Sequence, residues 1–106
     1  MAQLKSVAAT NLARGATEVY EVSNETPYAK VTEIIISNHS ENTTSCKISV
    51  YKNATAQEVV IIPGLQLIAS QSRIISMATS LNSQDKIIAE PDQPNCIDVL
   101  VSCVEM

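Results

Sequence analysis

SCKISVY at residues 45–51 and CIDVLVSCVE at residues 96–105 decide the fold class of this chain. In both stretches apolar residues alternate with more polar ones. Successive side chains of a β-strand point to opposite faces of the sheet, so this alternation predicts strands that bury one face. The expected buried faces are Cys46, Ile48 and Val50 in the first stretch and Ile97, Val99, Val101 and Cys103 in the second.

Further β-prone runs surround these two stretches, and turn residues separate them. Strands are predicted at residues 17–22, 28–37, 58–62 and 85–90, with two short strands or one bent strand at 65–77. Turns and loops are expected at 23–27, 38–44, 52–56, 79–84 and 91–95. Pro63-Gly64 fits a type II turn, because proline sets the second position and glycine accepts a positive φ at the third. This turn is expected to end the 58–62 strand.

The strand count and the composition predict an all-β fold. No stretch of ten or more residues shows a helical period, whereas seven or eight short strands follow one another. The chain contains no Phe, no Trp and only three Tyr, so Ile, Val, Leu and Ala must fill the interior. We therefore expect an antiparallel β-sandwich, jelly-roll-like or immunoglobulin-like.

The length of 106 residues corresponds to a single domain. Residues 1–14 are weakly patterned and are interpreted as an N-terminal arm or edge strand, whereas residues 15–106 are expected to form the β-sandwich domain. Deleting residues 1–14 should leave a folded domain but weaken its assembly.

Charge and hydropathy exclude two classes of partner. The formal net charge is −4, with 7 Lys and Arg against 11 Asp and Glu, and the charges are scattered. Nucleic-acid binding is not expected, because the phosphate backbone requires clustered positive charge. No run approaches the roughly 18 apolar residues of a membrane span, and no continuous apolar leader opens the chain. We expect a protein that is made and kept, or assembled, in a soluble compartment.

No catalytic, cofactor-binding or metal-binding constellation is recognised. His39, the single histidine, lies near Ser37, Ser40 and Glu41 in a polar loop and is interpreted as a solvated residue, because a triad needs an oriented base. Three aspartates, Asp85, Asp92 and Asp98, lack calcium-loop spacing, although a calcium site built from separate loops stays open.

The cysteines leave two alternatives. An odd count at wide spacing does not indicate a disulfide framework, so Cys46, Cys96 and Cys103 are interpreted as free thiols that act as small apolar side chains. The other possibility is one bridge, for which Cys46 and Cys103 are the better candidates. Geometry decides between the two.

The order of the strand motifs resembles that of small β-sandwich virion proteins of tailed bacteriophages. In those domains an I-x-I-x-N strand is followed by L-x-x-x-D-x-I and a closing V-D-V-x-V-S-G-x-E. The matching residues are Leu81, Asp85 and Ile87 in the first block and Asp98, Val99, Val101, Ser102 and Glu105 in the last. Gln84 and Cys103 stand where the pattern has glycine. The resemblance covers about residues 17–106.

The resemblance implies a non-enzymatic structural or accessory virion protein. It could decorate the capsid or lie at the neck or tail surface, with other virion proteins and further copies of itself as partners, after synthesis in the host cytoplasm. The alternative is a carbohydrate- or receptor-binding sandwich of a tail fibre. That alternative requires at least two of Tyr20, Tyr28 and Tyr51 to converge in an aromatic platform. No cofactor is expected in either case.

Overall fold

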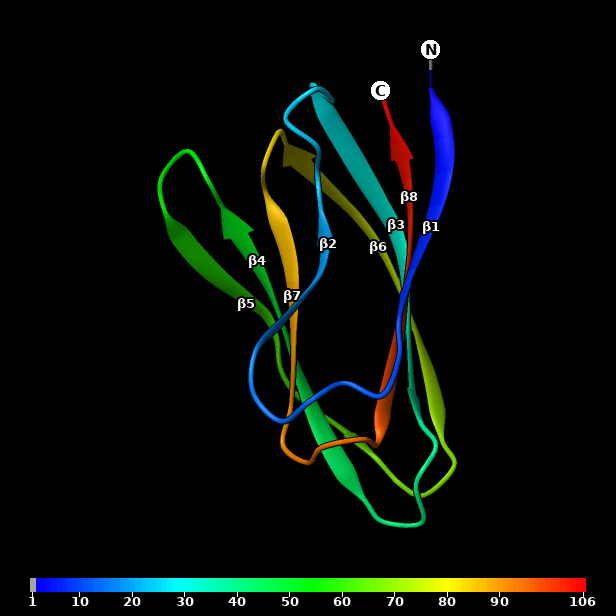
Figure 1. Cartoon of the computed structure of the whole chain (residues 1–106). Coiled ribbons are helices and arrows are strands. Elements are labelled where there is room, and N and C mark those ends of the chain that lie inside the picture. The colour runs from blue at the N-terminus through cyan, green and yellow to red at the C-terminus, as the bar shows by residue number, and fades with distance from the viewer. Residues whose placement is uncertain (1) are drawn as a thin grey trace.

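The computed structural model describes residues 2–106 and consists of eight β-strands connected by short loops (Figure 1). Within this range, no helix is long and apolar enough to cross a membrane. The strands are β1 (Gln3–Ala9), β2 (Thr17–Glu21), β3 (Tyr28–Asn38), β4 (Thr44–Lys52), β5 (Gln57–Leu67), β6 (Ser72–Asn82), β7 (Lys86–Pro91) and β8 (Ile97–Glu105).

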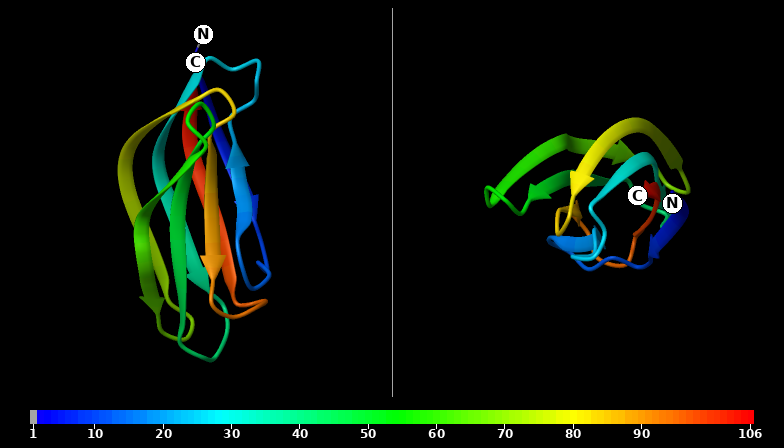
Figure 2. Two further views of the ribbon diagram at one scale, coloured as in Figure 1. Left: turned by 90° about the vertical axis from the view of Figure 1, so that its left-hand side faces the viewer. Right: turned by 90° about the horizontal axis from the view of Figure 1, so that it is seen from above.

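The strands form two four-stranded sheets that pack face to face. The first sheet has the order β1-β8-β3-β6 and the second the order β2-β7-β4-β5, and all neighbours are antiparallel. The left view of Figure 2 shows β5 and β6 along one side of the molecule and β1 and β2 along the other. This arrangement confirms the predicted all-β antiparallel sandwich.

The core between the sheets is aliphatic. The largest fully buried side chains include Ile34, Ile36, Ile48, Leu67, Leu81, Ile87 and Ile97. They come from the alternating positions of β3 to β8, and β-branched residues pack well on a pleated surface. The predicted inward faces of β4 and β8 are confirmed, because Cys46, Ile48 and Val50 and their counterparts on β8 are all buried.

The expected turn at Pro63-Gly64 was wrong. Both residues lie inside β5, which runs from Gln57 to Leu67. Proline is tolerated there because β5 is an edge strand, where a missing N–H on the open side removes no ladder bond. The β4–β5 pairing is also irregular between Cys46 and Ser49, so the ladder already deviates near this point.

The expected loop at residues 79–84 was only partly correct, because β6 continues to Asn82. Leu81 is fully buried and pairs with Ala29 of β3, which holds this polar-looking segment in the sheet. Residues 65–77 contain two strands, with a turn between Leu67 and Ser72.

The N-terminal segment contributes both an edge strand and a core residue. The whole of β1 pairs with β8, from Gln3 opposite Glu105 to Ala9 opposite Val99. Leu12 follows and is buried in the core, and its backbone bonds to those of Ile97 and Asn95.

Candidate functional site

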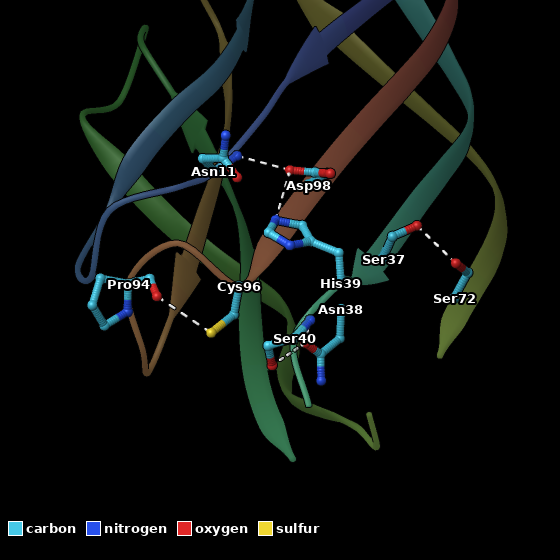
Figure 3. Close-up of polar contacts among 9 residues, drawn as sticks. All are labelled: Asn11, Ser37, Asn38, His39, Ser40, Ser72, Pro94, Cys96 and Asp98. Carbon is cyan, nitrogen blue, oxygen red and sulfur yellow. Dashed lines mark hydrogen bonds and ion pairs between the residues drawn. The ribbon is translucent and has the colours of Figure 1, made fainter. Parts of the chain in front are cut away.

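His39 lies in the loop after β3 and faces Asp98 of β8 (Figure 3). Its Nε2 atom is 3.5 Å from Oδ1 of Asp98, and the two side chains are 41% and 38% exposed. The same Oδ1 atom accepts a 2.7 Å hydrogen bond from the backbone N–H of Asn11. Asp98 therefore ties the loop after β1 and the loop after β3 to β8.

The serines near His39 in sequence bond to other groups. The hydroxyl of Ser40 donates to Oδ1 of Asn38 at 2.7 Å, and Ser37 shares a 2.8 Å hydrogen bond with Ser72 of β6 (Figure 3). In the described residues, no serine hydroxyl is hydrogen-bonded to His39. The arrangement is therefore a set of loop contacts and not that of a nucleophile beside its base.

Asn38 is the buried polar residue that holds this end of the sandwich together, and sequence reasoning missed it. Its side chain is almost fully buried. Nδ2 donates to the carbonyl oxygens of Asn42, Leu67 and Ile68, and Oδ1 accepts from the backbone N–H and the hydroxyl of Ser40. One amide thus fixes both the β3–β4 loop and the β5–β6 turn. Two signals in the sequence could have identified it, its position at the end of an apolar run and the final asparagine of the I-x-I-x-N motif.

Asp85 has a similar role at the other end of the molecule. Its carboxylate is buried and accepts backbone N–H bonds from Asn53 and Asn82, both at 2.9 Å. Lys52 Nζ lies 2.7 Å from its second oxygen. Burial alone would raise the pKa of Asp85, but the hydrogen bonds from Lys52 and the two amides outweigh it and lower the pKa.

The three aspartates lie in separate places and serve separate loops. The carboxylate of Asp92 accepts hydrogen bonds from the hydroxyl of Thr44 and the backbone N–H of Ser45, and these bonds lower its pKa. Asp98 holds the loops around His39. Among residues 2–106, no group of three or more His, Cys, Asp or Glu side chains could hold a metal ion.

The tyrosines do not form an aromatic platform. Tyr20 is buried, and its hydroxyl donates to Oε2 of Glu105, which links β2 to β8 across the sandwich. Burial and this hydrogen bond raise the pKa of Tyr20. The Tyr51 ring lies 5.6 Å from Lys86 Nζ, whereas Tyr28 is exposed at the start of β3. The carbohydrate-binding alternative therefore lacks the convergent rings that it requires.

All three cysteines are free and buried. Cys46 lies near the β3–β4 loop, opposite Leu65, whereas Cys103 pairs with Val31 toward the other end of β3, so the alternative of a Cys46–Cys103 bridge was wrong. Burial raises the pKa of Cys46 to about 11. Cys96 donates to the carbonyl oxygen of Pro94 at 3.3 Å (Figure 3). These thiols contribute to packing.

The surface best suited to binding is the edge formed by β5 and β6. Four exposed aliphatic side chains lie along it, Val59 and Val60 toward the β4–β5 turn and Ile68 and Ile74 toward the β5–β6 turn. The two sheets also diverge toward the β4–β5 hairpin (Figure 1), so that Val59 is 49% exposed although it pairs with buried Val50. These exposed apolar side chains make this edge the candidate surface for a protein–protein contact.

No protein-family model matches the sequence, and no curated protein matches it. The fold is shared with solved structures. A chain in the capsid structure of the Helicobacter pylori bacteriophage KHP30 has a TM-score of 0.64 and 14% identity, over 99% of this chain and 87% of that one. The Drosophila NLP core, whose structure concerns pentamer formation and histone binding, has a TM-score of 0.60 and 10% identity over 100% and 97%.

A third similar structure comes from Bacillus endospore appendages, described as disulfide-linked pili. Its TM-score is 0.57 and its identity 8%, over 100% of this chain and 87% of that one. All three likenesses extend over the whole sandwich at low sequence identity. They show that this chain has a complete β-sandwich fold that also occurs in a phage capsid structure.

Proposed function

We propose that this chain is a structural component of a tailed-phage particle that acts by protein–protein assembly. It decorates the capsid as a cement protein or covers the neck or tail, and its partners are other virion proteins and further copies of itself. It is made in the host cytoplasm and then becomes part of the virion.

The observation that carries this proposal is the likeness to the phage capsid chain, which extends over 99% of this chain. The sequence motifs of the last two strands, which resemble those of small phage virion domains, support it independently. The distribution of polar groups also fits, because His39, Asp85, Asp92 and Asp98 each hold loops in place and none faces a common cleft.

An assembly role also agrees with the surface of the molecule. A protein present in many copies can rely on modest individual contacts, because repetition in a symmetric particle multiplies their effect. The exposed aliphatic edge of β5 and β6 offers such a contact, and the Ser-, Thr- and Asn-rich loops keep the rest of the surface polar.

Purified particles provide the test. Mass spectrometry of particles banded in a density gradient should detect this chain at a fixed ratio to the major capsid protein. Immunogold labelling with an antibody against the chain should then place it on the head, neck or tail. Absence of the chain from washed, infectious particles would refute the proposal.

A further inference from the structure

We propose that copies of this chain dock side by side, with β6 of one copy adding antiparallel to β1 of the next, so that Ile74 lies opposite Ala8 of the partner subunit. The inference deepens the proposed structural role by naming both the contact surface and its occupant, which is a second copy in the same orientation.

An apolar row crosses the outer face of the first sheet. Ala8 pairs with Leu100, Leu100 pairs with Ile35, and Ile35 pairs with Ile74. The four side chains therefore cross β1, β8, β3 and β6 in a single line and end at an open edge on each side. Ile74 is 62% exposed at one end, and Ala8 is exposed at the other.

The directions of the two edge strands permit antiparallel addition of a second copy. Each sheet has four strands and every neighbour is antiparallel, so its two edge strands run in opposite directions. A second copy placed alongside in the same orientation therefore presents β1 antiparallel to β6, which is the geometry of ordinary strand addition. Contacts of this kind are heterologous and repeat around a ring or along a row.

Side chains match on both faces in this register. Ile74 and Ala8 of the partner subunit continue the outer apolar row. One residue further along, Ile75 lies opposite Val7 of the partner subunit. Both of these residues are core-facing, because Ile75 pairs with buried Ile34 and Val7 pairs with buried Val101. Apolar cross-strand pairs of this kind stabilise a sheet.

The second sheet does not favour strand pairing at the same edge. Pro63 interrupts the donors of β5. Glu58 pairs with Tyr51, Tyr51 with Lys86 and Lys86 with Glu21, so the corresponding row would bring Glu58 against Glu21 of the partner subunit. The geometry therefore assigns the hydrogen-bonded contact to β6 and β1.

The contact area is limited by the length of β1. Its seven residues span about 23 Å at about 3.3 Å per residue, which is about half of the 42 Å length of the molecule. A contact of this length is small beside the roughly 800 Å² that each partner contributes to a standard interface, so stable association relies on its repetition around a ring or along a row.

Mixed single-cysteine variants test the inference. Ala8→Cys and Ile74→Cys protein are combined in equal amounts and oxidised with copper phenanthroline, and the native thiols are buried and do not compete. Intact mass spectrometry distinguishes the two variants. We expect a dimer that contains one copy of each, in at least tenfold excess over the dimers that either variant forms alone, since directly opposed strand residues meet disulfide geometry.

Ser6→Cys mixed with Ile74→Cys is the matched control. Ser6 is exposed and lies two residues, about 7 Å, from Ala8 along the same face of β1. It should cross-link at least tenfold less. Thermal melts verify that every variant is folded. As a measurement without oxidant, sedimentation should detect association of the unmodified protein, and Ile74→Asp should abolish it.

Three results would overturn the inference. Predominant Ile74→Cys homodimers would indicate a two-fold β6–β6 contact, equal cross-linking of Ser6→Cys would indicate no defined register, and the absence of both cross-links and association would exclude the contact. None of these outcomes affects the particle test, which asks only whether the chain is part of the virion.

Discussion

Replacing Asp85 by asparagine should destabilise the fold more than the loss of any single exposed charge. This carboxylate is buried, and it accepts hydrogen bonds from the backbone amides of Asn53, in the β4–β5 turn, and Asn82, at the end of β6. It also pairs with Lys52 at 2.7 Å. Asparagine keeps the shape and one acceptor oxygen but loses the charge, and it leaves Lys52 without its partner.

The expected cost is about 2–4 kcal/mol, since hydrogen bonds to charged groups contribute about 1.5–3 kcal/mol and breaking a buried pair costs about 3–5 kcal/mol. This cost is lower than that of breaking a fully buried pair, because the Lys52 side chain is 31% exposed and recovers some hydration when its partner is lost. For a domain of this size the melting temperature should fall by at least about 8 °C.

Urea unfolding at pH 7 measures the loss, with Glu90→Gln as the matched control. Glu90 pairs with Lys47 at 3.5 Å, but both side chains are partly exposed, so its replacement should cost less than about 1 kcal/mol. Equal effects of the two substitutions would refute the assignment of Asp85 as a structural anchor.

The same residue predicts a pH dependence. The pKa of Asp85 is lower in the folded chain than its ordinary value of 3.8. Its ionised form therefore stabilises the fold above that value, and this stabilisation is lost as the pH falls through the folded-state pKa. Asp85→Asn should flatten the acid limb of a stability–pH curve below about pH 4. An unchanged acid limb would contradict this.

Three other predictions follow from buried contacts. Tyr20→Phe removes the hydrogen bond to Glu105 and should cost about 1.5–3 kcal/mol in urea unfolding, because the lost bond is to a charged group. Native protein should react negligibly with a thiol reagent at pH 8, whereas three thiols should react in denaturant, because Cys46 has a pKa of about 11 and all three cysteines are buried. Deleting residues 1–14 should preserve cooperative thermal unfolding but abolish self-association and lower the melting temperature, because Leu12 leaves the core; a non-cooperative melt would contradict it.

The sequence was sufficient to predict the strands that bury one face and have clear turns on both sides. Alternation identified β4 and β8 because each lies within its sheet and packs against the core on one side only. Alternation failed at the edge. β5 carries Pro63 and Gly64, which normally end strands, and only its place at the sheet edge makes them acceptable.

The structural roles of the polar residues that organise the loops could not be predicted from the sequence, although Asp85 belongs to a motif of the phage resemblance. Asn38 and Asp85 lie in polar segments that resemble ordinary turns, and their importance comes from partners that are distant in the sequence. Asn38 bonds to the carbonyl of Leu67, 29 residues away, and Asp85 to the amide of Asn53, 32 residues away. No local pattern specifies such pairs, because the topology creates them.

The number of strands in the first sheet sets the polarity of any array built from it. With β1 present the strand count is even, and the two borders run in opposite directions. Without β1 the count becomes odd, and β8 and β6 would border the sheet while running the same way. Repeats in one orientation would then need parallel pairing, and antiparallel pairing would require each copy to be inverted. A seven-residue strand can thus determine, by parity alone, whether identical subunits repeat in one orientation or must alternate.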